Sequence, residues 1–217
     1  MRCGNTAQPR LRGVSFVSLN SYSGAMTPLS RKWFADDAVT LAPKLLGKMV
    51  RNGKCVGRIV ETEAYTTDPA SHGRVITPRS RIMQDTYGHW YVYFTYGMHY
   101  CANVTTNKDS VGAVLIRAVE PIDGIELMEA RRGTRDIYNL CSGPAKFAQA
   151  FGIDKAENGL SIEDDFAIYD APAVPKKDIA SGPRIGIKAG LELPWRFYVR
   201  DSPFVSHGGG KRRAKAL

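Results

Sequence analysis

Apolar residues recur along the chain with two different periods. In residues 35–46 they fall at helical spacing, whereas in most later segments they alternate or run together as they do in strands. Asn52-Gly53 lies between two strand-like runs and is a strong hairpin signal. Ser142 is placed to cap a later helix, and Pro144 suits its first turn. The pattern predicts, in chain order, a helix at 35–46, strands at 48–51 and 55–64, a long loop at 66–85, strands at 90–95, 99–105 and 112–119, helices at 123–132 and 143–151, a surface excursion at 154–180, and strands at 184–187 and 195–200.

The order of these elements predicts the fold class. They include neither an internal repeat nor the regular alternation of strands and helices that builds a parallel sheet. We therefore predict one α+β domain over residues 31–206, built on a curved, mainly antiparallel β-sheet with flanking helices. Residues 1–30 and 207–217 lack such periodicity and are expected to be a flexible basic leader and a flexible basic tail. The leader has two other interpretations, namely a transit peptide or an overextended start upstream of Met26.

Composition excludes several classes of protein. Hydrophobic residues make up 43% and charged residues 24% of the 217, as in an ordinary folded domain. No apolar run approaches the roughly 18 residues of a membrane helix, so no membrane partner is expected. The four cysteines form no CxxC pair, which argues against a zinc ribbon and fits a reducing compartment. We expect a bacterial cytoplasmic protein, or a nuclear one if the source is eukaryotic, that works as a monomer.

The net charge of +9 is unevenly distributed. Residues 1–32 carry five basic groups and residues 206–217 carry four, both without an acid, so residues 33–205 are neutral overall. Within them, residues 44–117 have a net charge of +5 and residues 118–179 a net charge of −5. A basic half that also contains the aromatic motifs suits a polyanionic partner, although a charge run is more often only solvated surface.

The strand at 55–64 ends in a candidate for acid–base chemistry. Alternation along it predicts that Glu61, Glu63 and Tyr65 share one face, where a carboxylate beside an aromatic ring could orient water. The alternative is a solvated strand face. His72, in the loop that follows, has no second His or Cys at ligand spacing, so it does not indicate a metal site.

The segment 90–100 is rich in aromatic residues. Tyr91 and Tyr93 alternate onto one face, and Tyr96-Gly97-Met98 reads as a turn with an exposed aromatic tip. Packing in the core would explain Tyr91 and Phe94. A bulky tip beside basic residues also matches the wedge of a protein that opens a DNA duplex.

Several motifs resemble one known family when they are taken in order. They are VETEAY at 60–65, His72, TPRSR at 77–81, YVY at 91–93, YGM at 96–98, Asn103, LIRAVEP at 115–121, LCSGP at 140–144 and RFYVR at 196–200. Together they resemble the alkyladenine (3-methyladenine) DNA glycosylases, the mammalian-type class also found in bacteria. The resemblance spans roughly residues 31–206. It implies a fold related to the C-terminal domain of formyltransferases.

The resemblance also implies an activity. The family hydrolyses the N-glycosidic bond of damaged purines such as 3-methyladenine, 7-methylguanine, hypoxanthine and ethenoadenine, which it flips out of double-stranded DNA. It is monofunctional and uses no cofactor or metal. Glu63 matches the glutamate that activates the attacking water, and Arg117 matches the arginine that helps to hold this water.

The remaining matches concern the base and the duplex. By resemblance, Tyr65, His72 and Tyr93 form aromatic walls that stack on an alkylated, cationic purine, Asn103 rejects the amino group of guanine, and Ile187 belongs to the pocket wall. Tyr96, with Met98 beside it, fills the gap left by the flipped nucleotide. Thr77, Met83 and His99 are expected to contact the duplex; His99 stands where mammalian members have tyrosine.

Two other functions remain as alternatives. The first is a nucleic-acid-binding module of the same fold that has lost catalysis, which replacement of Glu63 or Arg117 would favour. The second is a substrate-binding domain of a formyltransferase-type enzyme. The presence of Glu63, Tyr96 and Asn103 together argues against the latter.

Overall fold

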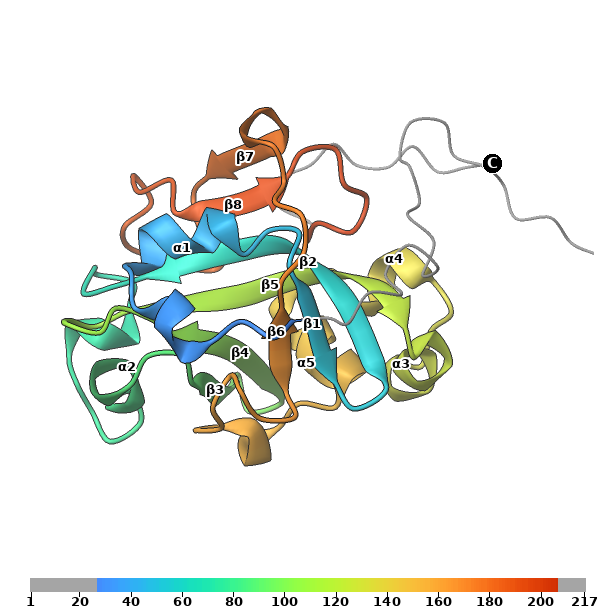
Figure 1. Ribbon diagram of the computed structural model, residues 1–217, viewed down its shortest axis with the longest axis horizontal. Helices are drawn as coiled ribbons and strands as arrows, with labels where there is room; N and C mark the ends of the chain where they lie inside the picture. Colours follow the sequence, from blue (N-terminus) through green and yellow to red (C-terminus); the bar gives the residue numbers. More distant parts are fainter. Residues whose placement is uncertain (1–26, 207–217) are drawn as a thin grey trace, which may run out of the picture.

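Eight strands form one sheet in the computed structural model, which describes residues 27–206 (Figure 1). Six of them follow the order β3-β4-β5-β2-β1-β6, while β8 pairs with β2 and β7 pairs with β8. Each pairing between these strands is antiparallel, which confirms an α+β fold on a mainly antiparallel sheet. The strands are β1 (Met49–Asn52), β2 (Cys55–Tyr65), β3 (Trp90–Thr95), β4 (His99–Thr105), β5 (Ala113–Asp123), β6 (Ala167–Tyr169), β7 (Ile179–Gly182) and β8 (Arg196–Val199).

Short helices flank the sheet and complete its core. Helix α1 packs against β2, and α5 packs against β4 and β5 (Figure 1). Fully buried side chains of both helices belong to the same hydrophobic cluster as those of the sheet. The α-helices are α1 (Ala38–Lys44), α2 (Ile82–Asp85), α3 (Ile125–Arg132), α4 (Ile137–Leu140) and α5 (Pro144–Phe151), and the 3-10 helices are η2 (Arg31–Phe34), η3 (His72–Arg74), η4 (Lys155–Glu157) and η5 (Lys176–Asp178). Among residues 27–206 no helix has the length and apolar character to cross a membrane.

Both predicted hairpins are confirmed. Strands β1 and β2 pair through Asn52 and Cys55, with Gly53 at a positive φ of 55° in the turn. Strands β3 and β4 have the predicted bounds and pair from Trp90 to Thr95. Local turn chemistry favours these two connections, because residues with positive φ in a short loop match the twist of the flanking strands.

The long strand β2 changes partner in mid-course, and this change positions the site. Its first half pairs with β1 and its second half with β8, while β5 pairs along its other edge. The register between β2 and β5 slips twice near Glu61, so that Val60 and Arg117 have no partner in the ladder. Such bulges re-aim the side chains that follow them. Ile59 faces the main core before the bulge, whereas Ala64 faces it afterwards. The bulge thereby turns Glu61 and Glu63 away from that core.

Two expectations for the C-terminal third are wrong. The segment 154–180 is not only a surface excursion, because it contains β6 and the buried Phe166. The Phe166 ring stacks on Trp90 with centroids 3.6 Å apart, and Trp90 Nε1 donates to the Phe166 carbonyl at 2.7 Å. Residues 184–187 are irregular, and the strand lies before them as β7. Both strands are short and lie among acidic residues and prolines, so the hydrophobic pattern did not predict β6 or β7.

Helix boundaries differ in smaller ways. Gly143, not Ser142, precedes α5 at the capping position, and Pro144 occupies the first turn as predicted. The Ser142 hydroxyl instead accepts a hydrogen bond from Lys146 at 3.5 Å. The segment 66–85, predicted as a loop, contains η3 and α2. Both helices are too short to produce a helical period in the sequence.

The ordered contacts begin before the expected domain boundary at residue 31. Leu29 is 6% exposed, and its amide donates to the carbonyl of Ile168 in β6 at 2.8 Å. At the other end Ser206 is 4% exposed. Most of the expected leader (residues 1–26) and the whole expected tail (207–217) lie outside the described residues.

Candidate active site

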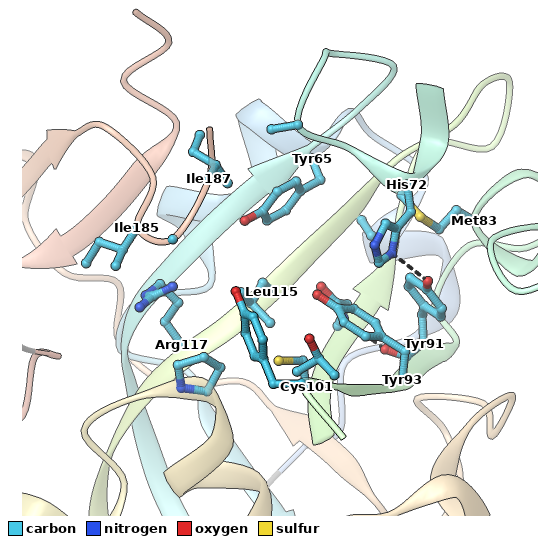
Figure 2. A pocket seen from close by; sticks show the side chains of 17 residues that line it. Tyr65, His72, Met83, Tyr91, Tyr93, Cys101, Leu115, Arg117, Ile185 and Ile187 are labelled. Atoms are coloured by element: carbon cyan, nitrogen blue, oxygen red, sulfur yellow. Dashed lines mark hydrogen bonds between the residues drawn. The ribbon is translucent and has the colours of Figure 1, made fainter. Parts of the chain in front are cut away.

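A cavity of about 350 Å³ opens between the ends of four strands and two loops (Figure 2). Strands β2, β3, β4 and β5 contribute side chains to it, as do the loop before η3 and the irregular segment 185–187. Its size lies at the lower end of the range for small-molecule sites. The main lining side chains are those of Tyr65, His72, Tyr91, Tyr93, Cys101, Asn103, Leu115, Arg117 and Ile187.

Aromatic side chains dominate the cavity. The Tyr93 ring centroid lies 4.8 Å from that of His72 and 5.2 Å from that of Tyr91. Tyr65 projects toward this group from the end of β2 (Figure 2). His72 Nδ1 and the Tyr91 hydroxyl form a 2.9 Å hydrogen bond, which fixes the imidazole. Such a slot suits a flat heteroaromatic ring, which can stack on aromatic side chains.

Burial keeps these aromatic groups uncharged. It raises the pKa of Tyr91 to about 12 and that of Tyr93 still further. Burial, together with the neighbouring Glu63 carboxylate, also raises the pKa of Tyr65 well above its usual range. Burial and the charge of Arg79 both lower the pKa of His72, so the imidazole is neutral at pH 7. The cavity therefore presents neutral rings and hydroxyl groups.

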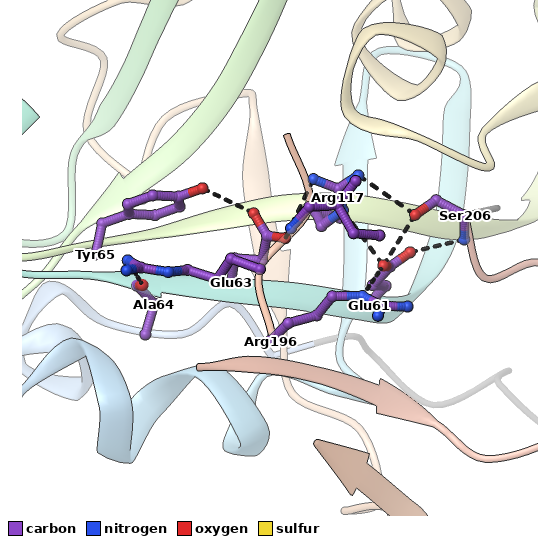
Figure 3. A network of polar contacts seen from close by, with 9 residues as sticks. Glu61, Glu63, Ala64, Tyr65, Arg117, Arg196 and Ser206 are labelled. Atoms are coloured by element: carbon purple, nitrogen blue, oxygen red, sulfur yellow. Dashed lines mark hydrogen bonds and ion pairs between the residues drawn. The ribbon is translucent and has the colours of Figure 1, made fainter. Parts of the chain in front are cut away.

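One carboxylate, that of Glu63, contacts Tyr65 and Arg117 of the cavity wall (Figure 3). Glu63 is fully buried, and its Oε1 accepts from the Ile185 amide at 2.7 Å and pairs with Arg117 Nη1 at 3.2 Å. Its Oε2 accepts from the Tyr65 hydroxyl at 2.8 Å. Tyr65, Arg117 and Ile185 all line the cavity, so Glu63 contacts three lining residues without lining the cavity itself.

A second buried carboxylate shares the same arginine. Glu61 Oε1 accepts from Arg196 Nε at 2.6 Å and from the Ser206 hydroxyl at 2.9 Å, and it lies 3.3 Å from Arg117 Nε. Its Oε2 accepts from the Ser206 amide at 2.7 Å. Two carboxylates and two guanidinium groups thus balance in a buried network drawn from β2, β5, β8 and the last described residue (Figure 3).

Arg117 connects the network to the cavity. It occupies the bulged position of β5, and its side chain is 8% exposed. Burial opposes its charge, but the carboxylates of Glu63 and Glu61 outweigh burial and raise its pKa. A permanent cation is therefore held beside the carboxylate that is nearest to the cavity.

Beside the cavity the β3–β4 hairpin presents an apolar tip. Tyr96 is 81% and Met98 69% exposed, and Phe94 is also exposed. Tyr96 and Gly97 both have positive φ, 52° and 69°, which is the geometry of a type I′ turn. A tyrosine in this conformation is strained by about 1–2 kcal/mol. The turn requires this conformation, and a bulky aromatic residue kept there at that cost is a candidate for a functional role.

Comparison with known proteins agrees with this arrangement. The model of the methylpurine-DNA glycosylase family matches residues 32–203. A protein of Burkholderia cenocepacia is 46% identical over 85% of this chain and 93% of its own length. Proteins of Rhodopseudomonas palustris and Chlorobaculum parvum are 46% and 44% identical over 84% and 83% of this chain, and over 90% and 91% of their own lengths. All three relatives are provisionally named 3-methyladenine DNA glycosylases.

The chain belongs to the methylpurine-DNA glycosylase family. The resemblance inferred from the motifs is thereby confirmed.

The structure brings together most of the residues that this family resemblance selected. Tyr65, His72, Tyr93, Asn103 and Ile187 all line the cavity. Arg117 lines it as well, whereas Glu63 lies behind the wall. The face shared by Glu61, Glu63 and Tyr65 exists as predicted, and its two carboxylates are buried rather than solvated.

The residues selected for duplex contact in this glycosylase divide into two groups. Thr77 and His99 are exposed, as is Met98. Met83 is 1% exposed and packs with Tyr91 and Ala113 at the cavity wall, so a duplex contact for it is wrong. Met83 lies on the inner side of the short helix α2, which explains why it is buried. The expectation of core packing holds for Tyr91 but not for Phe94, which is 48% exposed.

Several side chains of the glycosylase site were missed by sequence reasoning. Arg196 and Ser206 join the network from far along the chain, and Arg184 and Asp68 form a buried pair behind Tyr65 with distances of 2.6 and 3.1 Å. Cys101 lies in the cavity as a thiol, because burial raises its pKa to about 11. In the sequence, two features could have indicated these residues: the RFYVR motif at 196–200, which contains Arg196, and the apolar strand that contains Cys101. Within residues 27–206 no group of His, Cys, Asp and Glu could hold a metal ion.

Proposed function

We propose that this methylpurine-DNA glycosylase family member is a monofunctional enzyme of base excision repair. It flips a damaged purine out of double-stranded DNA into the aromatic cavity and hydrolyses the N-glycosidic bond with a water activated by Glu63. The bases concerned are of the class of 3-methyladenine, 7-methylguanine, hypoxanthine and ethenoadenine. We also propose that it works as a monomer in the bacterial cytoplasm; the relatives it resembles are bacterial proteins.

One observation carries this proposal above the others. Glu63 is a fully buried carboxylate held by Arg117 at 3.2 Å, immediately behind a slot walled by Tyr65, Tyr93 and His72. A purine stacked in that slot would place its sugar toward Arg117 and Glu63. The Oε2 atom of Glu63 accepts one described hydrogen bond, from Tyr65, so it can accept another from a water.

The reaction needs a general base that accepts a proton from water, and a negative charge near the sugar. The water oxygen adds to C1′ of the deoxyribose while the bond from C1′ to the purine breaks, and the bonding electron pair leaves with the base. Glu63 takes one proton of the water, and the other remains on the hydroxyl of the abasic site. Its carboxylate also stabilises the positive charge that develops on the sugar. A cationic base leaves as a neutral molecule, whereas a neutral base must also take up a proton.

Asn103 is proposed to exclude undamaged guanine. It is 3% exposed, and its Nδ2 donates to the Tyr91 carbonyl at 3.0 Å, which fixes the amide in the cavity. A fixed amide can clash with an exocyclic amino group and so reject a common base.

Asn103→Ser is expected to raise the excision of undamaged guanine, because it removes that obstacle while flipping is unchanged. Release of guanine and hypoxanthine from matched duplexes under single-turnover conditions measures this effect. Guanine discrimination equal to that of the unmodified enzyme would contradict the assignment.

Tyr96 is proposed to fill the gap that the flipped nucleotide leaves. Tyr96→Ser is then expected to act on flipping and not on bond cleavage, since unstacking and unpairing cost a few kcal/mol and cost least for a poorly paired base. The loss of activity should be largest for a well-paired lesion and smallest opposite a poor partner. Leu127→Ser is a suitable control, because Leu127 is exposed on α3. The same loss for every opposing base would exclude a wedge role.

The experiment that tests the proposed function is base release from duplexes that each contain one defined lesion, with an undamaged duplex as control. Release from at least one alkylated or deaminated duplex, and not from the control, is expected. Binding to these duplexes without any release would favour the alternative, a catalytically silent nucleic-acid-binding module of the same fold.

A further inference from the structure

Two arginines lie against the tyrosine walls of the cavity. The guanidinium carbon of Arg184 lies 4.7 Å from the centroid of the Tyr65 ring, and that of Arg79 lies 4.8 Å from the centroid of the Tyr93 ring. Both tyrosines line the cavity, whereas neither arginine does. Each guanidinium group therefore lies against a wall ring without lining the cavity itself.

The two arginines differ in how their charge is balanced. Arg184 is buried and forms a two-pronged pair with Asp68 at 2.6 and 3.1 Å, so its charge is neutralised where it lies. Arg79 is exposed and donates to the carbonyl oxygen of Phe94 at 2.7 Å, which is a neutral partner. Among the described residues no carboxylate forms an ion pair with Arg79. A net positive charge thus remains beside the Tyr93 wall.

This charge acts on groups inside the cavity. It adds to burial in lowering the pKa of His72, and it also favours the ionised form of Tyr91. Both residues line the cavity. A cavity in which a cation destabilises a second positive charge on His72 also destabilises a positive charge on a bound base.

We propose that Arg79 is a specificity-determining residue that biases excision toward neutral damaged purines and away from cationic ones. The Tyr93 ring already makes a cation–π contact with a guanidinium group, so its quadrupole is less available to attract a cationic base. The positive charge of Arg79, which no carboxylate pairs, also repels that base. A neutral purine such as hypoxanthine stacks on Tyr93 without this repulsion.

The inference rests on the proposed function and refines its substrate class. The family resemblance implied that the aromatic walls favour an alkylated, cationic purine. Arg79, which lies against Tyr93 with a charge that no carboxylate pairs, opposes that preference, whereas the charge of Arg184 is neutralised by Asp68.

The test compares one cationic and one neutral lesion in the same duplex sequence. Base release from duplexes with 7-methylguanine or hypoxanthine is measured under single-turnover conditions at saturating enzyme, for the unmodified protein and for Arg79→Gln. The ratio of the 7-methylguanine rate to the hypoxanthine rate is expected to rise by about three- to tenfold, because a full positive charge next to the Tyr93 wall is removed. Arg79→Lys keeps the charge and should bring the ratio back toward that of the unmodified protein.

Arg81→Gln is the matched control. Arg81 is exposed two residues further along the same loop, and no described ring lies under its guanidinium group. Its loss should weaken DNA binding without changing the ratio. Equal factors on both lesions in Arg79→Gln would mean that Arg79 only contacts phosphate, and the inference would be wrong while the proposed function stands. Release of neither base by the unmodified protein would contradict the inference, and it would contradict the proposed function as well if 3-methyladenine and ethenoadenine duplexes also released nothing.

Discussion

Glu63→Gln is expected to abolish base release while leaving DNA binding close to that of the unmodified protein. The amide has the same shape and keeps an oxygen for the Ile185 amide and Arg117, and its nitrogen can donate to the Tyr65 hydroxyl. It cannot take a proton from water or stabilise positive charge on the sugar. Removal of such a group lowers the rate by about 10²- to 10⁴-fold.

Single-turnover release from a hypoxanthine duplex, together with the dissociation constant for the same duplex, measures this effect. Glu120→Gln serves as control, because Glu120 lies on β5 near the same strand pair but faces Arg58 at 3.6 Å and does not line the cavity. It should retain nearly full activity. Turnover by Glu63→Gln within a few-fold of the unmodified protein would remove Glu63 from the reaction.

Glu61→Gln is expected to destabilise the fold strongly. The carboxylate of Glu61 is fully buried and accepts hydrogen bonds from Arg196 and twice from Ser206, besides its ion pair with Arg117. The amide would leave a buried guanidinium group without its counter-ion and would direct an NH₂ group at one of these donors. Loss of one partner from a buried ion pair lowers the free energy of unfolding by about 3–5 kcal/mol.

Urea unfolding at neutral pH measures this loss. Glu120→Gln is again the control, since its pair with Arg58 is longer and partly exposed and should contribute at most about 1 kcal/mol. Near-equal stability of the two variants would mean that desolvation already offsets the attraction within the network. Among folded Glu61→Gln molecules, base release should fall less than in Glu63→Gln, because Glu61 acts only through Arg117.

Local sequence determined the two hairpins, because the residues of a short turn specify its conformation. Asn52-Gly53 fixed the β1–β2 hairpin, and Tyr96-Gly97 fixed the β3–β4 hairpin with its exposed tip. Alternation then placed Tyr91 with Tyr93, because side chains two residues apart in a strand share a face. The resemblance of the ordered motifs selected the five pocket residues that the cavity brings together.

The sequence could not determine which face those residues occupy. Strict alternation from Ile59 would have turned Glu61 and Glu63 into the main core, and only the bulge at Val60 reverses this. That bulge coincides with the exchange of β1 for β8 as the partner of β2 and with a matching bulge at Arg117. Pairing between strands far apart in the sequence sets such a register, so no local pattern reports it.

Tertiary structure alone also assembled the charges around the site. Ser206, Arg196 and Glu61 meet across more than a hundred residues of chain, as do Arg184 and Asp68. A charged residue reads as solvated surface in a sequence, because burial becomes favourable only once a partner is folded against it. The sequence by itself therefore determined the hairpins, the aromatic faces and the family, whereas the bulge, the buried network and the cations against the tyrosine walls were decided by long-range packing.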